Sequence, residues 1–224
     1  MITFGLTGGI ASGKSTVTKT FRANNIPMVD ADIAARDVVV PGSYGLELIV
    51  RDFGPEYLNA DGTLDRIKLG KLVFADKDAL ARINEIMMPL INTESNFQIA
   101  KLHSEGHYIV GYDGALICEM GNSEKFRPLI VVHCPRDTQA ERLMKRNSLT
   151  RQEAMLRIDA QMPVEKKIEL ADYTIDTSKT LEDSVKQTET IVYQLQVRMY
   201  QKKMADGEIF LNQIPSPWRE SLGL

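Results

Sequence analysis

Cysteine, histidine and tryptophan are scarce in this chain of 224 residues, which has two cysteines, three histidines and one tryptophan. Cys118 and Cys134 form no paired-cysteine motif, so the chain offers neither a zinc ligand set nor a disulfide framework. No apolar run approaches the roughly 20 residues that cross a bilayer. The opening MITFGLTGGIASGK lacks the basic segment that precedes the apolar stretch of a secretory signal. We therefore expect a cytoplasmic protein with no membrane contact.

The chain also lacks an excess of charge of either sign. It has 27 Lys plus Arg against 30 Asp plus Glu, a formal net charge of -3, which does not favour nucleic acid as a partner. The composition, 43% hydrophobic and 25% charged, excludes disordered, collagen-like and coiled-coil classes. We expect small-molecule substrates, no nucleic acid, and a monomer or weak homo-oligomer, with any phosphate group bound locally.

Short apolar segments alternate with helical patterns along much of the chain. This alternation favours an α/β fold built on a parallel sheet with right-handed crossovers. A helix is expected to begin near Lys14, directly after the first strand. The predicted strands cover residues 2–7, 26–30, 109–118, 129–134 and 173–176.

The stretch between the second and third predicted strands is too long for one crossover. It is mostly helical in pattern, and Pro89 should kink or break its main helix. We interpret residues 33–106 as a helical domain inserted into a core formed by residues 1–32 and 107–200. Residues 201–224 form a C-terminal tail.

A phosphate-binding motif follows the first predicted strand directly. Residues 8–15 read GGIASGKS and match G-x-x-x-x-G-K-[ST], in the strand-to-helix setting that the mechanism requires. Glycines let backbone N–H groups turn around an anion, and a helix N-terminus adds about half a positive charge. Lys14 can reach the β- and γ-phosphates of a nucleotide, and the Ser15 hydroxyl can bind Mg²⁺. The alternative, a purely structural glycine turn, has no need of a lysine and a serine there.

Two aspartates, Asp30 and Asp32, follow the second predicted strand. Ligands of open parallel sheets gather at the carboxyl ends of the strands, so these carboxylates should face the phosphate-binding loop. Asp32 is our candidate for the base that accepts the proton of an attacking hydroxyl. The alternative is that either aspartate only caps the helix expected near Ile33, and the sequence leaves the two interpretations about even.

Arg142 and Arg146 lie four residues apart and share one face of a predicted helix. Such a pair can clamp a phosphoryl group and stabilise the charge of its transition state. A solvated helix face is the alternative. Arg36 is a weaker candidate of the same kind.

Several segments, taken in order, resemble the dephospho-coenzyme A kinase family over roughly residues 1–180. The resemblance is carried by GLTGGIASGKST, VDADIAARDVVVPG, ADGTL, VFAD, PLI, RPLIVVHCP, ERLMKRNSLT, RIDAQM and ADYTID. It implies a three-layer P-loop kinase core, an inserted helical substrate-binding domain, and a helical lid at about residues 137–165. The implied reaction moves the γ-phosphoryl group of ATP to the 3′-hydroxyl of dephospho-coenzyme A, the last step of coenzyme A biosynthesis.

The resemblance also implies roles for individual residues. Lys14, Asp32 and Arg142 would be catalytic, Asp32 and Arg36 would lie on the acceptor side, and Ser15 would bind Mg²⁺. The implied ATP-binding residues are Gly8, Gly9, Ile10, Ala11, Ser12, Gly13, Lys14, Ser15, Thr16, Arg142 and Arg146.

The sequence departs from the family pattern at three places. Met88 stands where a histidine is expected, Ala115 begins a segment that usually starts with proline, and Thr177 replaces the usual asparagine. Two other functions remain open at this point. One is a kinase of another small molecule or nucleotide monophosphate, and the other is a nucleotide-binding switch that transfers nothing.

Overall fold

The computed structural model describes residues 1–223 of the chain. It divides into two compact units, one formed by Met1–Met28 with Leu102–Leu224 and the other by Val29–Lys101. Leu224, the last residue of the predicted tail, lies outside the described residues.

The structure contains a five-stranded sheet in the order β2-β3-β1-β4-β5, and the strands β3, β1, β4 and β5 lie within the first unit. The pairs β1–β3, β1–β4 and β4–β5 are parallel, so β1 lies between β3 and β4. The strands are β1 (Ile2–Gly8), β2 (Met28–Asp30), β3 (Ile109–Asp113), β4 (Leu129–His133) and β5 (Tyr173–Asp176). This parallel sheet confirms the predicted α/β class.

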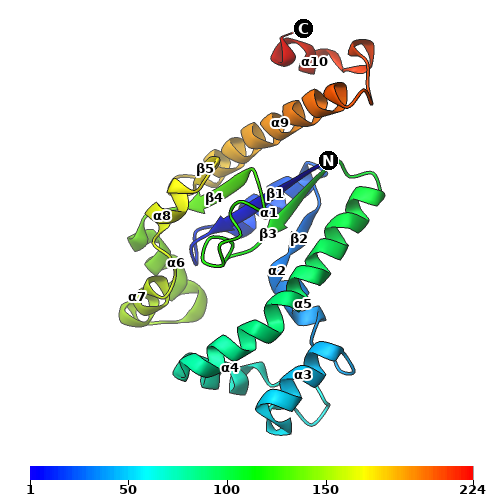
Figure 1. Cartoon of the computed structure of the whole chain (residues 1–224). Helices are drawn as coiled ribbons and strands as arrows, with labels where there is room; N and C mark the ends of the chain where they lie inside the picture. Colours follow the sequence, from blue (N-terminus) through cyan, green and yellow to red (C-terminus); the bar gives the residue numbers. More distant parts are fainter. Residues whose placement is uncertain (224) are drawn as a thin grey trace. The chain divides into compact units, whose positions relative to one another are not determined.

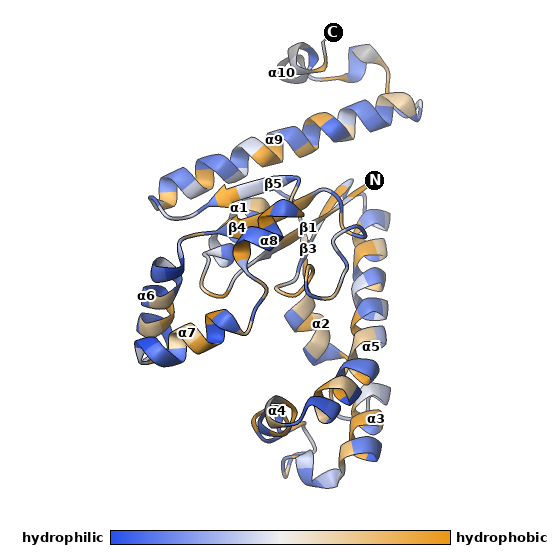
Figure 2. Ribbon diagram, turned by 60° about the vertical axis from the view of Figure 1, so that its left-hand side comes forward, coloured by the Kyte–Doolittle hydropathy of each residue, from blue (hydrophilic) through white to orange (hydrophobic). Residues whose placement is uncertain are grey.

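Helices α1 (Lys14–Ala23) and α9 (Leu181–Ala205) pack together and cover the sheet (Figure 1). A cluster of buried apolar residues from the sheet and both helices forms the core, in which the rings of Phe4 and Phe21 lie 4.8 Å apart. In Figure 2 the central strands are mostly hydrophobic, whereas α9 alternates between hydrophobic and hydrophilic residues. That alternation is typical of a helix with one buried face.

The predicted third strand is too long by several residues. Residues 109–118 were predicted as one strand, but β3 ends at Asp113. The Gly114 N–H still bonds to the Leu6 carbonyl, and the chain then turns, with the Met120 N–H bonded to the Leu116 carbonyl. Apolar residues continue beyond the strand because Ile117 and Cys118 are buried in this turn, not because the ladder continues.

Three helices connect β4 to β5. They are α6 (Arg136–Asn147), α7 (Arg151–Asp159) and α8 (Val164–Glu169). Helices α6 and α7 bury a small apolar cluster of their own, formed by Ala140, Leu143, Ala154 and Ile158. A capping box at Thr150, with Glu153, starts α7.

The second unit is helical around a separate apolar cluster that includes Leu46, Ile49 and Ile86. Its elements are α2 (Ala31–Asp37), α3 (Tyr44–Phe53), the 3₁₀ turn η1 (Pro55–Tyr57), α4 (Arg66–Ala75) and α5 (Lys77–Ser104). Pro89 lies inside α5, which continues through it. The sequence had predicted a kink or a break at Pro89, and the helix is not broken there. Buried residues on both sides of the proline, Ile86 and Ile99, hold the helix in place where one backbone hydrogen bond is lost.

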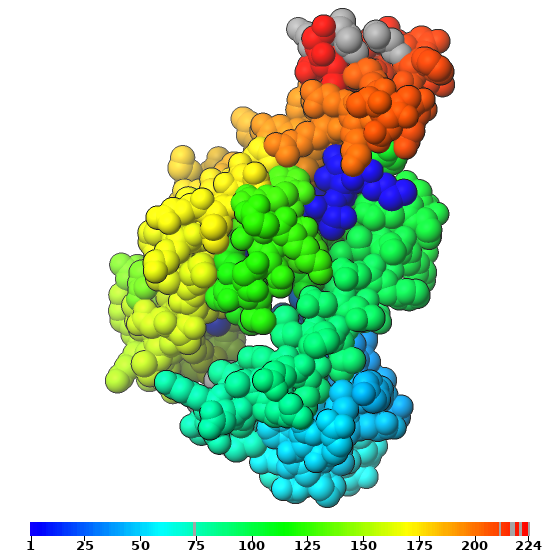
Figure 3. Space-filling view, viewed as in Figure 1, coloured from blue at the N-terminus to red at the C-terminus, as the bar shows by residue number. Residues whose placement is uncertain are grey.

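The tail after α9 folds back onto that helix. It contains η2 (Leu211–Gln213), α10 (Ser216–Arg219) and η3 (Glu220–Leu222). Trp218 stacks on Tyr193 of α9 at 4.8 Å, and Figure 3 shows the red tail residues against the orange end of α9. Among the described residues no helix is long and apolar enough to cross a membrane.

Candidate active site

The turn from Gly8 to Ser15 joins β1 to α1, and its shape requires glycine. A Cβ atom at Gly8 would lie 2.5 Å from the Val132 carbonyl oxygen, so no larger residue fits beside β4. Ala11 and Gly13 have φ values of 58° and 88°, in the left-handed region. This backbone closes into a compact loop that leads directly into the helix.

Helix α1 begins without a side-chain cap. Gly13 is its N-cap residue, no side-chain cap bond is formed there, and the first turn contains no acidic residue. The amide groups and the positive end of the helix dipole are therefore available to an anion. The sequence predicted this arrangement from the motif alone.

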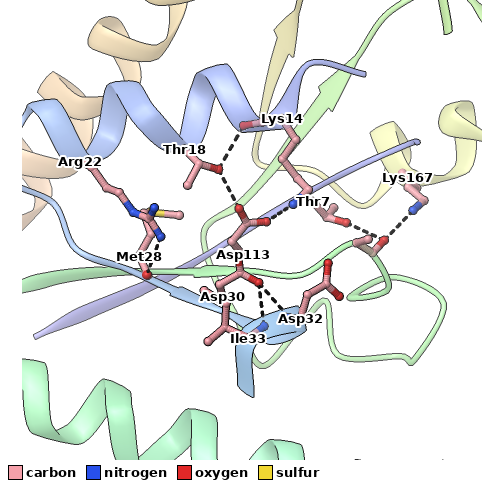
Figure 4. A network of polar contacts seen from close by, with 11 residues as sticks. Thr7, Lys14, Thr18, Arg22, Met28, Asp30, Asp32, Ile33, Asp113 and Lys167 are labelled. Carbon is pink, nitrogen blue, oxygen red and sulfur yellow. Dashed lines mark hydrogen bonds and ion pairs between the residues drawn. The ribbon is translucent and has the colours of Figure 1, made fainter. Parts of the chain in front are cut away.

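Lys14 forms an ion pair with Asp113, the last residue of β3. The Asp113 carboxylate is only 5% exposed, and its second oxygen accepts a hydrogen bond of 2.7 Å from the Thr18 hydroxyl. Figure 4 shows the carboxylate between these two side chains of α1. Asp113 was missed in the sequence analysis, although a carboxylate that ends an apolar strand beside the loop strand was a usable signal.

The oxygen donors that suit a magnesium ion are present at the start of α1. Ser15 is exposed on the first turn, and Asp113 carries the buried carboxylate next to Lys14. A serine hydroxyl and an aspartate are the protein ligands that P-loop enzymes use for Mg²⁺, together with phosphate oxygens and water. Among residues 1–223 no cluster of three or more His, Cys, Asp or Glu could hold a metal by itself. The donor set therefore fits Mg²⁺ that arrives with a nucleotide.

Arg142 of α6 is held against the loop by Thr177. Its guanidinium donates 3.1 Å to the Thr177 hydroxyl and 2.7 Å to the Thr177 carbonyl. The same hydroxyl donates 2.6 Å to the Ser12 carbonyl, so Thr177 connects the arginine to the phosphate-binding loop. A cavity of about 290 Å³ adjoins these groups and is also lined by Gly13 and Thr16.

Arg146 lies one turn further along α6 and is exposed, with its guanidinium bonded to the neighbouring Asn147 side chain at 2.9 Å. The predicted pair of arginines is thus unequal. Arg142 is fixed beside the loop, whereas Arg146 is at the surface. The role of Arg146 in ATP binding stays a prediction.

In the second unit, Asp30 and Asp32 have different local roles. The Asp30 carboxylate accepts hydrogen bonds from the Asp32 and Ile33 amides at 2.8 and 3.2 Å, so Asp30 caps α2. Asp32 lies in the first turn of α2 with an exposed side chain. The capping interpretation therefore applies to Asp30, and the Asp32 carboxylate is left available for chemistry.

Arg36 and Arg66 are close neighbours within the same unit. Arg66 donates 3.4 Å to the Ala35 carbonyl, and burial and the positive charge of Arg36 both lower its pKa. Two guanidinium groups this close attract an anion, because each destabilises the charge of the other. Arg66 lies in a stretch that the sequence analysis did not single out.

The strand, glycine loop and helix, with Lys14, Ser15 and Asp113, define a P-loop kinase core. Two solved structures share the fold. TT1252 from Thermus thermophilus aligns with a TM-score of 0.75 at 29% identity over 87% of this chain and 97% of its own. A dephospho-CoA kinase from Campylobacter jejuni aligns with a TM-score of 0.60 at 25% identity over 86% of this chain and 96% of its own.

Residues 2–183 match the dephospho-CoA kinase family. A dephospho-CoA kinase from Listeria monocytogenes is 42% identical over 190 residues, which is 85% of this chain and 95% of the relative. The chain therefore belongs to the dephospho-CoA kinase family. This confirms the predicted family and the predicted activity of an ATP-dependent phosphotransferase, and it decides against the switch and the other small-molecule kinases.

Proposed function

We propose that this kinase transfers the γ-phosphoryl group of ATP to the 3′-hydroxyl of the ribose of dephospho-CoA, the last step of coenzyme A biosynthesis. The single observation that carries the proposal is the Gly8–Ser15 loop with its Lys14–Asp113 pair, in a chain of this family. Phosphoryl transfer needs little covalent chemistry from the protein. Positioning and electrostatic stabilisation supply nearly all of the catalysis.

The donor side of the reaction is assigned to the first unit. The loop amides and Lys14 bind the β- and γ-phosphates, and Arg142 stabilises the transferred group. Ser15 and Asp113 would hold Mg²⁺, which neutralises phosphate charge when it is bound. Lys14 is already beside Asp113, so the lysine and the metal would share one carboxylate.

The acceptor side is assigned to the second unit, Val29–Lys101. Asp32 acts as the base that takes the proton of the attacking ribose hydroxyl, because its carboxylate is exposed and is not needed as the cap of α2. Arg36 and Arg66 bind anionic groups of the acceptor. Helices α6 and α7 are the segment that we assign as the lid.

The same assignment bears on the substrates, cellular location and oligomeric state of the enzyme. Its substrates are small molecules, ATP and dephospho-CoA, and we infer a cytoplasmic location and a monomer or weak homo-oligomer. Size-exclusion chromatography with light scattering measures the oligomeric state directly.

An acceptor panel tests the proposed reaction. Purified protein with Mg-ATP is assayed against dephospho-CoA, AMP, dCMP and shikimate, and the phosphorylated position is located by NMR. We expect turnover of dephospho-CoA alone, with the new phosphate on the 3′-oxygen. Turnover of another acceptor, without phosphorylation of dephospho-CoA, would overturn the proposal.

A further inference from the structure

Both backbone polar groups of Ile10, in the middle of the phosphate-binding loop, are bonded to glutamine side chains. The Ile10 N–H donates to Oε1 of Gln161 at 2.6 Å, and Nε2 of Gln139 donates to the Ile10 carbonyl at 3.0 Å. These bonds join residues 151 and 129 positions apart in the chain. The Ile10 peptide is therefore clamped from outside the loop.

The two glutamines come from the segment between β4 and β5. Gln139 lies on α6 and is 3% exposed, and Gln161 follows the end of α7. The fit is close, because a Cβ atom at Gly9 would lie 2.4 Å from Nε2 of Gln139. A buried amide with this little space has few alternative positions.

Apolar contacts hold the same part of the loop. The side chains of Ile10 and Ala11 pack against the α6–α7 cluster that contains Leu143 and Ile158. The loop is thus attached to the α6–α7 segment both by its backbone and by its side chains. A displacement of that segment would move the loop with it.

An internal ion pair fixes the position of Gln161. The amide of the next residue, Met162, donates 3.2 Å to Oε1 of Glu119, and that oxygen lies 2.7 Å from Nζ of the fully buried Lys167. Lys167 also donates 3.0 Å to the Ala115 carbonyl, which accepts a second bond from Thr7, the residue before the loop begins (Figure 4). Because the fully buried Lys167 ammonium needs these oxygen partners, the pair ties the chain around Gln161 to Glu119 and to the Ala115 carbonyl.

We propose that Gln139 and Gln161 are positioning residues for ATP, which hold the Ile10 peptide so that the later amides of the loop are aligned on the phosphates. The proposal rests on the role assigned above to the loop. Neither glutamine needs to touch the nucleotide. Because the clamp acts on the phosphate site, its loss should affect ATP and not the acceptor.

The test is Gln161→Met, which removes the acceptor oxygen and keeps the length of the side chain. Gln152→Met, at an exposed position of α7, is the matched control. For each protein kcat and the KM values of ATP and dephospho-CoA are measured, together with ADP affinity by calorimetry and the melting temperature. Gln161 is only partly buried, so the variant should fold. If it does not, Gln161→Ala removes the same acceptor without a new apolar group.

For Gln161→Met we expect both kcat/KM for ATP and the affinity for ADP to fall about tenfold. This is the effect expected from the loss of one hydrogen bond between uncharged groups that positions the loop. The KM of dephospho-CoA should stay within about twofold, and Gln152→Met should match wild type. A lower melting temperature with unchanged ATP parameters, or an equal loss for both substrates, would overturn the positioning role. Failure of the wild-type protein to bind ADP would instead refute the role of the loop itself.

Discussion

Lys14, the lysine of the phosphate-binding loop, is paired with the carboxylate of Asp113 at the end of the neighbouring strand β3. The pair joins the first residue of α1 to the sheet and leaves the lysine at the phosphate site. Thr18, one turn further along α1, fixes the other carboxylate oxygen. The carboxylate therefore orients the lysine, and in the proposed reaction it would also supply negative charge to a bound magnesium ion.

Asp113→Asn removes this charge while keeping a side chain of the same shape that can still bond to Thr18. We expect kcat to fall by about 10²-fold or more, because the lysine loses its orienting partner and Mg²⁺ loses a ligand. The Mg²⁺ concentration needed for half-maximal rate should rise. Steady-state kinetics across a Mg²⁺ titration measure both effects.

Asp137→Asn is the matched control, since Asp137 is an exposed residue of α6 that forms an ion pair with Arg151 of α7. It should behave like wild type. If Asp113→Asn kept its rate and its Mg²⁺ dependence, the carboxylate would have only a structural role.

The two aspartates at the start of α2 allow a paired comparison. Asp32→Asn should lower kcat by about 10²–10⁴-fold and leave ATP binding intact, because general-base catalysis contributes about that much. Asp30→Asn should change little, since asparagine caps a helix as well as aspartate does.

The readout is kcat together with ATP affinity by calorimetry, with circular dichroism as a check on α2. A larger loss of rate in Asp30→Asn than in Asp32→Asn would reverse the assignment of cap and base. If kcat fell only slightly, and equally, in Asp30→Asn and Asp32→Asn, Asp32 would not be the catalytic base.

The parts of the site that are continuous in sequence were predictable. The loop from Gly8 to Ser15 brings its glycines, Lys14 and the start of α1 together within one turn, so a motif describes it completely. Three of the predicted strands were right to within about one residue, because buried parallel strands are short, apolar and bounded by turns.

The parts that depend on distant contacts were not predictable from one sequence. Lys14 and Asp113 are 99 residues apart, and Ile10 and Gln161 are 151 apart. A glutamine that holds a backbone peptide has no motif, and Asp113 was hidden inside a strand predicted to run to Cys118. Asp30 and Asp32 could be separated only by seeing which carboxylate accepts the amides of α2.

Thr177, which stands where the family usually has asparagine, is suited to hold Arg142. Its buried hydroxyl accepts from the arginine and donates to the Ser12 carbonyl. Thr177→Val keeps the shape of the side chain and removes both bonds. We expect the KM of ATP to rise about five- to tenfold, because Arg142 keeps only its bond to the Thr177 backbone carbonyl and the Ser12 carbonyl loses its partner.

Thr174→Val, at an exposed position of β5, is the control and should leave the KM of ATP unchanged. Thr177→Asn restores the residue that the family pattern has. Recovery of ATP affinity in Thr177→Asn would show that either side chain can hold the arginine. A Thr177→Val enzyme with wild-type kinetics would exclude the hydroxyl from the site.

Asp172 contributes a pH-dependent attachment between the segment before β4 and the start of β5. Burial acts to raise the pKa of this carboxyl, but hydrogen bonds from Arg127 at 2.8 Å and from the Leu129 amide at 2.7 Å outweigh it, so the pKa is lowered. Because the folded-state pKa lies below the unfolded value of about 3.9, the contribution to stability is complete above that value. It is lost as the pH falls through the folded-state pKa.

Asp172→Asn should therefore reduce the free energy of unfolding in urea at pH 7, and the difference from wild type should shrink below pH 4. A difference that stays constant between pH 7 and pH 3 would mean that the ionised carboxylate contributes nothing beyond its shape.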